Sequence, residues 1–225
     1  YPGAAEALTR LIERKIGIAI LSNAPRRADE VRASMIALGL PQESARNVMS
    51  SGEEAYRALA RRDDPWYRKL GRRCFHLGPA RDKGMLDNPG FTVASRLEDA
   101  DFVLCTGLDR PDETVEDYRP RLEEAAKRGL PMVCANPDYE VVRGDKRELC
   151  AGALARVYES ELHGEVRWHG KPHGSVFRSA LALLDEEEVA RESRRQQDVE
   201  PLGAERRRQL GEEAGAIERV GAIDR

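Results

Sequence analysis

The stretch Ile16-Gly-Ile-Ala-Ile-Leu21 is a short continuous apolar run, followed by the polar turn Ser22-Asn-Ala-Pro25. Such a run is typical of a central parallel strand that is covered on both faces. Residues 27–38 then read as a helix that ends at Gly39. This order of strand, turn and helix predicts an α/β fold and places Ser22 and Asn23 at the carboxyl end of a strand, where open α/β sheets bind ligands.

The same alternation continues along the chain. Residues 4–14 and the segments that follow the first strand predict further helices and strands. The strands are expected at 46–50, 74–77, 101–106, 131–135 and 165–169, and the helices at 53–61, 114–128, 146–161 and 175–184. The polar and aromatic residues 63–73 read as a surface connection.

Composition excludes several classes of protein. The formal net charge of −3 offers no basic excess for a nucleic-acid partner. No run approaches the roughly 18 apolar residues of a membrane-spanning helix, and the first residues do not read as a signal peptide. The cysteines form no C-x-x-C, and Cys105 and Cys134 lie in apolar runs. We therefore expect buried, reduced thiols and a cytoplasmic protein.

Residues 185–225 differ from the rest of the chain. They are rich in charged residues and contain no aromatic residue, no cysteine and no strand-like run. Marginal helix or disorder is the natural interpretation, and a shift of reading frame after residue 184 is an alternative hypothesis.

Two loops carry candidate ligand-binding residues. Ser22 and Asn23 suit a phosphate-binding turn, with a hydroxyl and backbone N–H groups at a helix start, and equally an ordinary capped loop. Lys171, in Gly170-Lys-Pro172, follows a predicted strand and suits either phosphate neutralisation or a solvated surface position. Other common motifs fail: Gly164 to Lys171 is not a phosphate loop, and neither G-x-G-x-x-G before a helix nor G-x-S-x-G occurs.

Five segments in this order resemble the haloacid dehalogenase-like (HAD) hydrolases of class IIA, which include sugar-phosphate, nucleotide and phosphoglycolate phosphatases. The segments are Tyr1-Pro-Gly-Ala-Ala-Glu-Ala-Leu8, Leu21-Ser-Asn-Ala-Pro-Arg-Arg27, His76-Leu-Gly-Pro-Ala-Arg-Asp82, Cys134-Ala-Asn-Pro-Asp138 and Gly170-Lys-Pro-His173. The resemblance implies a Rossmann-like core, at 1–46 and 165–184, with an inserted α/β cap of the C2 type at 47–164. Homodimers formed through the cap occur in the family, so a homodimer is left open.

The resemblance also implies a Mg²⁺-dependent phosphatase of small phosphorylated metabolites. Ser22 matches the hydroxyl that binds the transferring phosphoryl group, with the Asn23 backbone beside it, and Lys171 matches the lysine that offsets its charge. Asn136 and Asp138 match a cap motif that could contact substrate. No metal ligand is assigned to a residue of this chain.

The family's first and fourth motifs have no counterpart in these residues. The first, D-x-D, supplies the nucleophile that forms an aspartyl-phosphate and a general acid/base, and the fourth, Gly-Asp, supplies a magnesium ligand. The only Gly-Asp, at Gly144, precedes Lys171 and is in the wrong order. We therefore expect an incomplete core, with the chain as written inactive and not binding Mg²⁺. The alternative function is a catalytically inactive relative that binds phosphate ligands or a protein partner.

Overall fold

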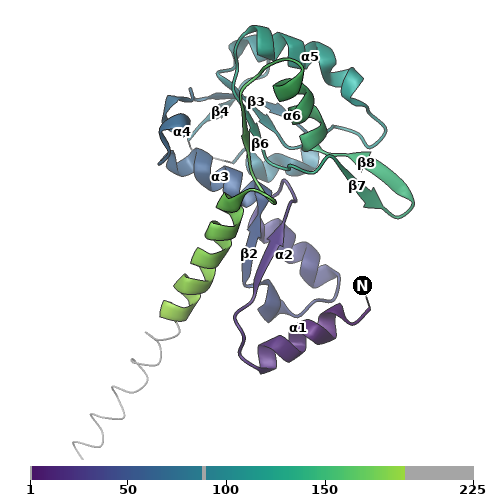
Figure 1. Ribbon diagram of the computed structural model, residues 1–225, viewed down its shortest axis with the longest axis vertical. Helices are drawn as coiled ribbons and strands as arrows, with labels where there is room; N and C mark the ends of the chain where they lie inside the picture. The colour runs from purple at the N-terminus through teal and green to yellow at the C-terminus, as the bar shows by residue number, and fades with distance from the viewer. Residues whose placement is uncertain (1, 88–89, 191–225) are drawn as a thin grey trace, which may run out of the picture. The chain divides into compact units, whose positions relative to one another are not determined.

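The computed structural model describes residues 2–87 and 90–190 (Figure 1). Among the described residues, those up to 182 form one compact unit, and residues 183–190 belong to a second. In the second unit residues 183–190 are helical, and the rest of the predicted tail lies outside the described residues. No helix in the described ranges is long and apolar enough to span a membrane.

The first part of the chain forms a small parallel sheet with helices around it. The elements are α1 (Ala4–Glu13), β1 (Ala19–Ser22), α2 (Ala28–Ala37), η1 (Gln42–Ala45) and β2 (Asn47–Ser50). β1 pairs with β2 in parallel, and the register places Ser22 beside Ser50. Val31 and Met35 of α2 pack with Val48 in a buried apolar cluster. The predicted strand at 16–21 is thus shorter and shifted, and within the described residues its partner is β2 alone.

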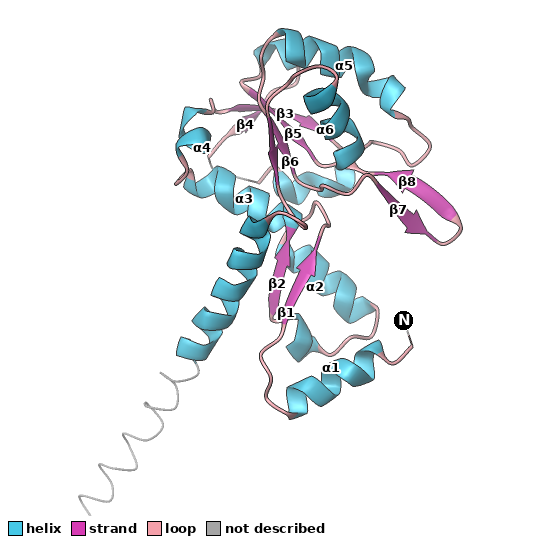
Figure 2. Cartoon of the chain, viewed as in Figure 1, coloured by secondary structure: helices cyan, strands magenta, loops and turns pink. Residues whose placement is uncertain are grey.

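The second sheet has five strands, all parallel, in the order β4-β3-β5-β6-β9. Its strands are β3 (Arg73–Leu77), β4 (Thr92–Val93), β5 (Phe102–Cys105), β6 (Met132–Cys134) and β9 (Val166–Trp168). Its helices are α3 (Ser51–Arg61), α4 (Pro65–Lys69), α5 (Val115–Lys127) and α6 (Ala151–Ser160), with 3-10 turns η2 (Ala80–Met85) and η3 (Leu97–Asp99). Figure 2 shows helices on both faces of this sheet.

The two faces of this sheet carry separate apolar clusters. Val103 and Cys105 of β5 pack with residues of α5 and α6, whereas Phe102 and Leu104 pack with α3 and α4. Since successive side chains of a strand point to opposite faces, a fully apolar strand is expected where both faces are covered. This explains why the apolar runs predicted β5 and β6 correctly.

Two predictions from the sequence are wrong in part. The predicted helix at 146–161 begins only at α6, because β7 (Glu140–Arg143) and β8 (Lys146–Leu149) form an antiparallel hairpin. Its tight turn contains Gly144 at φ +61°, a backbone conformation that glycine adopts without strain. The predicted surface connection at 63–73 contains α4, which buries Tyr67. Asp64 caps α4, and Pro65 suits its first turn.

Strand pairing divides the chain near the expected domain boundaries. The boundary expected at 46/47 falls between β1 and β2, which pair with each other. The boundary expected at 164/165 falls just before β9, which pairs with β6 of the larger sheet. By pairing, the small sheet ends at Ser50 and the large sheet at Trp168. The division into a core and a cap stays a prediction.

Candidate functional site

The carboxyl ends of β1, β5 and β6 border a cavity of about 250 Å³. Ser22 and Asn23 enter its wall from the end of β1, and Asn136 and Asp138 enter from the segment after β6. Thr106 follows β5. The cavity therefore lies where the carboxyl ends of parallel strands meet, the usual place for a ligand in an α/β protein.

Asn23 connects the end of β1 to the loop after β9. Its Oδ1 accepts a hydrogen bond from the Lys171 backbone N–H at 2.8 Å, and its Nδ2 donates to the Lys171 carbonyl oxygen at 3.1 Å. The same Nδ2 donates to Oδ1 of Asp138 at 2.7 Å. One side chain thus brings together three of the residues that the sequence singled out.

Ser22 and Lys171 retain hydrogen-bond donors. The Ser22 Oγ accepts from the Ala24 N–H at 3.2 Å, and its own O–H donates to no residue that the structure describes. The Lys171 Nζ donates to the Leu21 carbonyl oxygen at 3.2 Å, and an ammonium group has three protons. This contact holds the lysine charge at the end of β1, one residue before Ser22.

Gly170 allows the loop to approach β1 and α3 closely. Its φ of +103° favours glycine, and an added Cβ would lie 2.8 Å from both Asn23 Oδ1 and Ser51 Oγ. The Ser51 hydroxyl donates to the His169 carbonyl oxygen at 2.6 Å. A larger residue at position 170 would push Lys171 away from Asn23.

The buried side chain of Glu54 also contacts this loop. Glu54 accepts from the Gly170 N–H at 3.1 Å, and its Oε2 lies 3.3 Å from Nδ1 of His169. The Tyr67 hydroxyl is hydrogen-bonded to the other ring nitrogen of His169. Burial alone would raise the pKa of Glu54, but the contacts with His169, Ser175 and Gly170 outweigh it, and the pKa is lowered.

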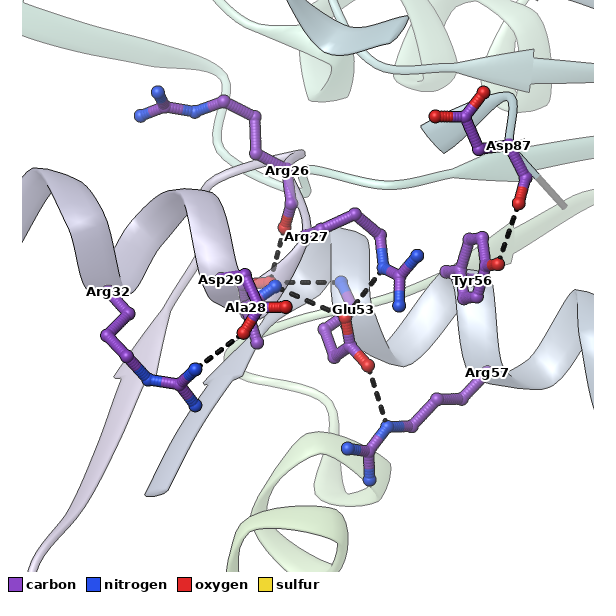
Figure 3. A network of polar contacts seen from close by, with 10 residues as sticks. Arg26, Arg27, Ala28, Asp29, Arg32, Glu53, Tyr56, Arg57 and Asp87 are labelled. Atoms are coloured by element: carbon purple, nitrogen blue, oxygen red, sulfur yellow. Dashed lines mark hydrogen bonds and ion pairs between the residues drawn. The ribbon is translucent and has the colours of Figure 1, made fainter. Parts of the chain in front are cut away.

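Figure 3 shows a second network, centred on Glu53. Its carboxylate accepts from Nε of Arg27 at 2.7 Å, Nε of Arg57 at 2.9 Å and the Ala28 N–H at 3.2 Å. Burial alone would raise the pKa of Glu53, but these hydrogen bonds outweigh it, and the pKa is lowered. The contact with Ala28 also caps the first turn of α2, which follows the Ser22 loop.

The residues that line the cavity also include Asp82, whose exposed fraction is 1%. Burial raises the pKa of Asp82 to about 6, although the Thr106 hydroxyl and the charges of Arg81 and Arg26 act in the opposite direction. Within the described residues neither carboxylate oxygen has a hydrogen bond of ordinary geometry. The Thr106 hydroxyl is 2.8 Å from Nε2 of His76, whose pKa is lowered by burial.

The structure brings the predicted site residues together and adds a second part for Asn23. The backbone contact to phosphate at Asn23 stays a prediction, and its side chain holds the Lys171 loop. Asn136 Oδ1 accepts from the Asp138 N–H at 3.0 Å, which shapes the turn after β6. Sequence reasoning missed Glu54 and Tyr67, which belong to no familiar motif, and it did not single out Asp82 within the segment His76–Asp82.

The described residues do not fit a magnesium site of the family type. No group of three or more His, Cys, Asp or Glu side chains in residues 2–87 and 90–190 could hold a metal ion. His169 and His173, four residues apart, are separately engaged: the ring of His173 stacks on Trp168. The expectation that this chain binds no Mg²⁺ stays a prediction.

The fold and site define an α/β protein with its ligand site at the carboxyl ends of parallel strands. A family model described as haloacid dehalogenase-like hydrolase matches residues 1–92. A crystal structure of a hydrolase of this family from Brucella suis is 35% identical, with a TM-score of 0.74. The match covers 84% of this chain and 66% of that protein. The chain belongs to the haloacid dehalogenase-like hydrolases.

More distant solved structures share the fold. A glycerol phosphate phosphatase from Mycobacterium tuberculosis, solved with calcium and with magnesium, is 23% identical with a TM-score of 0.61. That match, in the calcium complex, covers 82% of this chain and 52% of that protein. A p-nitrophenyl phosphatase from Archaeoglobus fulgidus is 20% identical, with a TM-score of 0.62 over 82% of this chain and 67% of that one. The predicted class IIA type fits these neighbours. No curated protein sequence matches the chain.

Proposed function

We propose that Ser22, Asn23 and Lys171 form the phosphoryl-binding part of a phosphatase that acts on small phosphorylated metabolites. The observation that carries this proposal is the pair of hydrogen bonds by which Asn23 fixes Lys171 beside the strand end that bears Ser22. Two polar side chains on segments far apart in the sequence are thereby held at the end of β1, where Ser22 lines the cavity.

Each residue has a chemical role in the proposal. The free O–H of Ser22 donates to a phosphoryl oxygen, and the Lys171 ammonium offsets the negative charge of the group. In phosphoryl transfer the protein contributes mainly positioning and charge stabilisation, so groups that are fixed before the ligand arrives are effective. Asn23 acts as a positioning residue. Asn136 and Asp138 line the cavity, where they would contact the rest of the substrate.

The remaining chemistry belongs to groups outside these residues. In the family a D-x-D strand that precedes the first helix supplies the nucleophile, and residues 1–225 contain no counterpart of it ahead of that helix. Mg²⁺ in the family offsets phosphoryl charge, but the described residues offer no cluster of ligands for it. We therefore derive no step through the metal. All four cysteines are free and buried, which suits the reducing cytoplasm that we propose as its location.

A second candidate function is phosphate binding without hydrolysis. The absence of a metal-ligand cluster among residues 2–87 and 90–190 favours it, since the binding residues are gathered whereas the metal ligands are not. The two candidates share Ser22 and Lys171. They differ in turnover and not in binding.

Phosphate release separates the two candidates. The assay compares the 225-residue chain with a version extended by the residues encoded before Tyr1, in MgCl₂, on a panel of small phosphate esters. The phosphatase proposal expects turnover by the extended version, reduced at least a hundredfold by Lys171→Ala and unchanged by Lys83→Ala at an exposed position outside the cavity. An extended version that binds phosphate and never hydrolyses esters would support the second candidate.

A further inference from the structure

Every backbone polar group of residues 169–171 is hydrogen-bonded. One N–H donates to the backbone of Cys134, and one carbonyl oxygen accepts from the backbone of His173. The other groups bond to the side chains of Asn23, Ser51 and Glu54. A backbone N–H that is already paired has no proton left for a ligand, so this loop reaches a phosphoryl group through the Lys171 side chain.

Two of these side chains hold one peptide unit of the loop from α3. Ser51 and Glu54 lie three positions apart at the start of that helix, so they share one of its faces. The Ser51 hydroxyl donates to the His169 carbonyl oxygen at 2.6 Å. Glu54 Oε2 accepts from the Gly170 N–H, in the same peptide unit, at 3.1 Å. The helix therefore fixes the backbone directly before Lys171.

Glu54 is a buried carboxylate whose contacts lie beside Lys171. Its exposed fraction is 6%. The oxygen that accepts from Gly170 also lies 3.3 Å from Nδ1 of His169, and the other ring nitrogen of His169 is hydrogen-bonded to the Tyr67 hydroxyl. Burying a carboxylate costs free energy that an apolar side chain of similar size would not cost. A carboxylate at this position therefore serves the two residues that it contacts.

We propose that Glu54 is a positioning residue for phosphate binding. Its carboxylate fixes the peptide unit between His169 and Gly170, and so holds the Lys171 ammonium at the end of β1. This inference rests on the proposed function, in which the phosphoryl group lies at Ser22 and Lys171. It goes beyond that function because Glu54 does not line the cavity and acts on the ligand only through the loop.

The effect on affinity follows from the number of conformations open to the loop. Without the carboxylate, the buried Gly170 N–H has no acceptor, which favours conformations that turn this N–H toward water. Lys171 is then in place in only a fraction of the molecules. The apparent dissociation constant for phosphate rises in inverse proportion to that fraction.

Titration calorimetry of inorganic phosphate into the chain tests this role. Glu54→Leu should weaken phosphate binding about tenfold, since one hydrogen bond to the loop corresponds to a factor of about ten. Glu54→Gln should restore the affinity to within about twofold of wild type, because its amide oxygen accepts from Gly170 and its amide nitrogen donates to Nδ1 of His169. If Glu54→Leu does not fold, Ser51→Ala removes the other contact to the same peptide unit and should weaken binding in the same way.

Tyr158→Phe separates positioning from general stability. The buried Tyr158 hydroxyl donates to the Leu130 carbonyl oxygen, away from the loop and the cavity. Tyr158→Phe and Glu54→Leu each leave one buried backbone group without its partner, so both should lower the urea midpoint of unfolding. Only Glu54→Leu should weaken phosphate binding.

The outcomes distinguish this inference from the proposed function. Equal phosphate affinity of Glu54→Leu and wild type would overturn the positioning role and leave the phosphoryl site intact. An equal loss of affinity in Tyr158→Phe, or a loss in Glu54→Gln as large as in Glu54→Leu, would also overturn it. Failure of phosphate to bind the folded wild-type chain would overturn both proposals.

Discussion

The side-chain amide of Asn23 is hydrogen-bonded to both backbone polar groups of Lys171, with an N–H···Oδ1 distance of 2.8 Å and an Nδ2–H···O distance of 3.1 Å. The two residues are separated by 148 positions in the sequence. This contact makes the position of the lysine depend on the end of β1. An amide suits this position because it both donates and accepts hydrogen bonds.

Replacing Asn23 tests this contact. Asn23→Ala removes three hydrogen bonds at a partly buried place, and we expect the free energy of unfolding to fall by about 1–2 kcal/mol. Phosphate affinity should fall as well, because the Lys171 loop is no longer held. Urea denaturation and calorimetry measure the two effects, with the exposed Thr9→Ala as control. Unchanged phosphate affinity would argue against a positioning role.

Tyr67 is expected to stabilise the loop through His169. Tyr67→Phe leaves a buried ring nitrogen of His169 without its partner, so the free energy of unfolding should fall by about 1–3 kcal/mol. Tyr139→Phe, at an exposed tyrosine, is the matched control and should have little effect. Equal stability of the two variants would mean that the Tyr67 hydroxyl contributes nothing.

The Glu53 network predicts a dependence on acidity. Because the folded protein lowers the pKa of Glu53 below its usual 4.5, this carboxylate stabilises the fold above that pH, and the contribution is lost as the pH falls. Glu53→Gln should cost ~2 kcal/mol at pH 7, between the values of exposed and buried ion pairs. The difference from wild type should shrink below pH 4.5. Glu116→Gln, at an exposed ion pair, should change nothing measurable.

Asp82 predicts the opposite dependence. Its pKa rises from 3.8 to about 6 on folding, so the folded state holds the proton more tightly and loses stability as the pH rises through this range. Two pH units correspond to about 3 kcal/mol. Asp82→Leu and Asp82→Asn should therefore gain stability relative to wild type between pH 4 and pH 7. A difference that does not change with pH would contradict the burial of this carboxyl group.

The parts of the fold that were predictable are those in which local pattern and tertiary environment agree. β5 and β6 are buried on both faces, so an uninterrupted apolar run in the sequence is enough to predict each strand. The β7–β8 hairpin was missed because its described residues are all at least partly exposed and show no apolar alternation. The helix at α4 was missed because five residues are too few for a helical period.

The candidate site shows the same limit. Ser22, Asn23 and Lys171 were found because they belong to motifs with a fixed order along the chain. Glu54 and Tyr67 were not found, since their partner His169 lies more than 100 positions away and only the fold brings them together. Asp82 lies in the segment His76–Asp82, but its burial was not predicted, because no sequence pattern indicates a buried carboxylate without a described hydrogen-bond partner.

The most direct test of the central claim is calorimetric titration of inorganic phosphate into the chain at pH 7. We expect one binding site, and affinity reduced at least tenfold by Ser22→Ala and by Lys171→Ala, with Lys83→Ala like wild type. Phosphate binding that is unaffected by both site variants, or no binding to a folded wild-type chain, would contradict the assignment of these residues to a phosphoryl site.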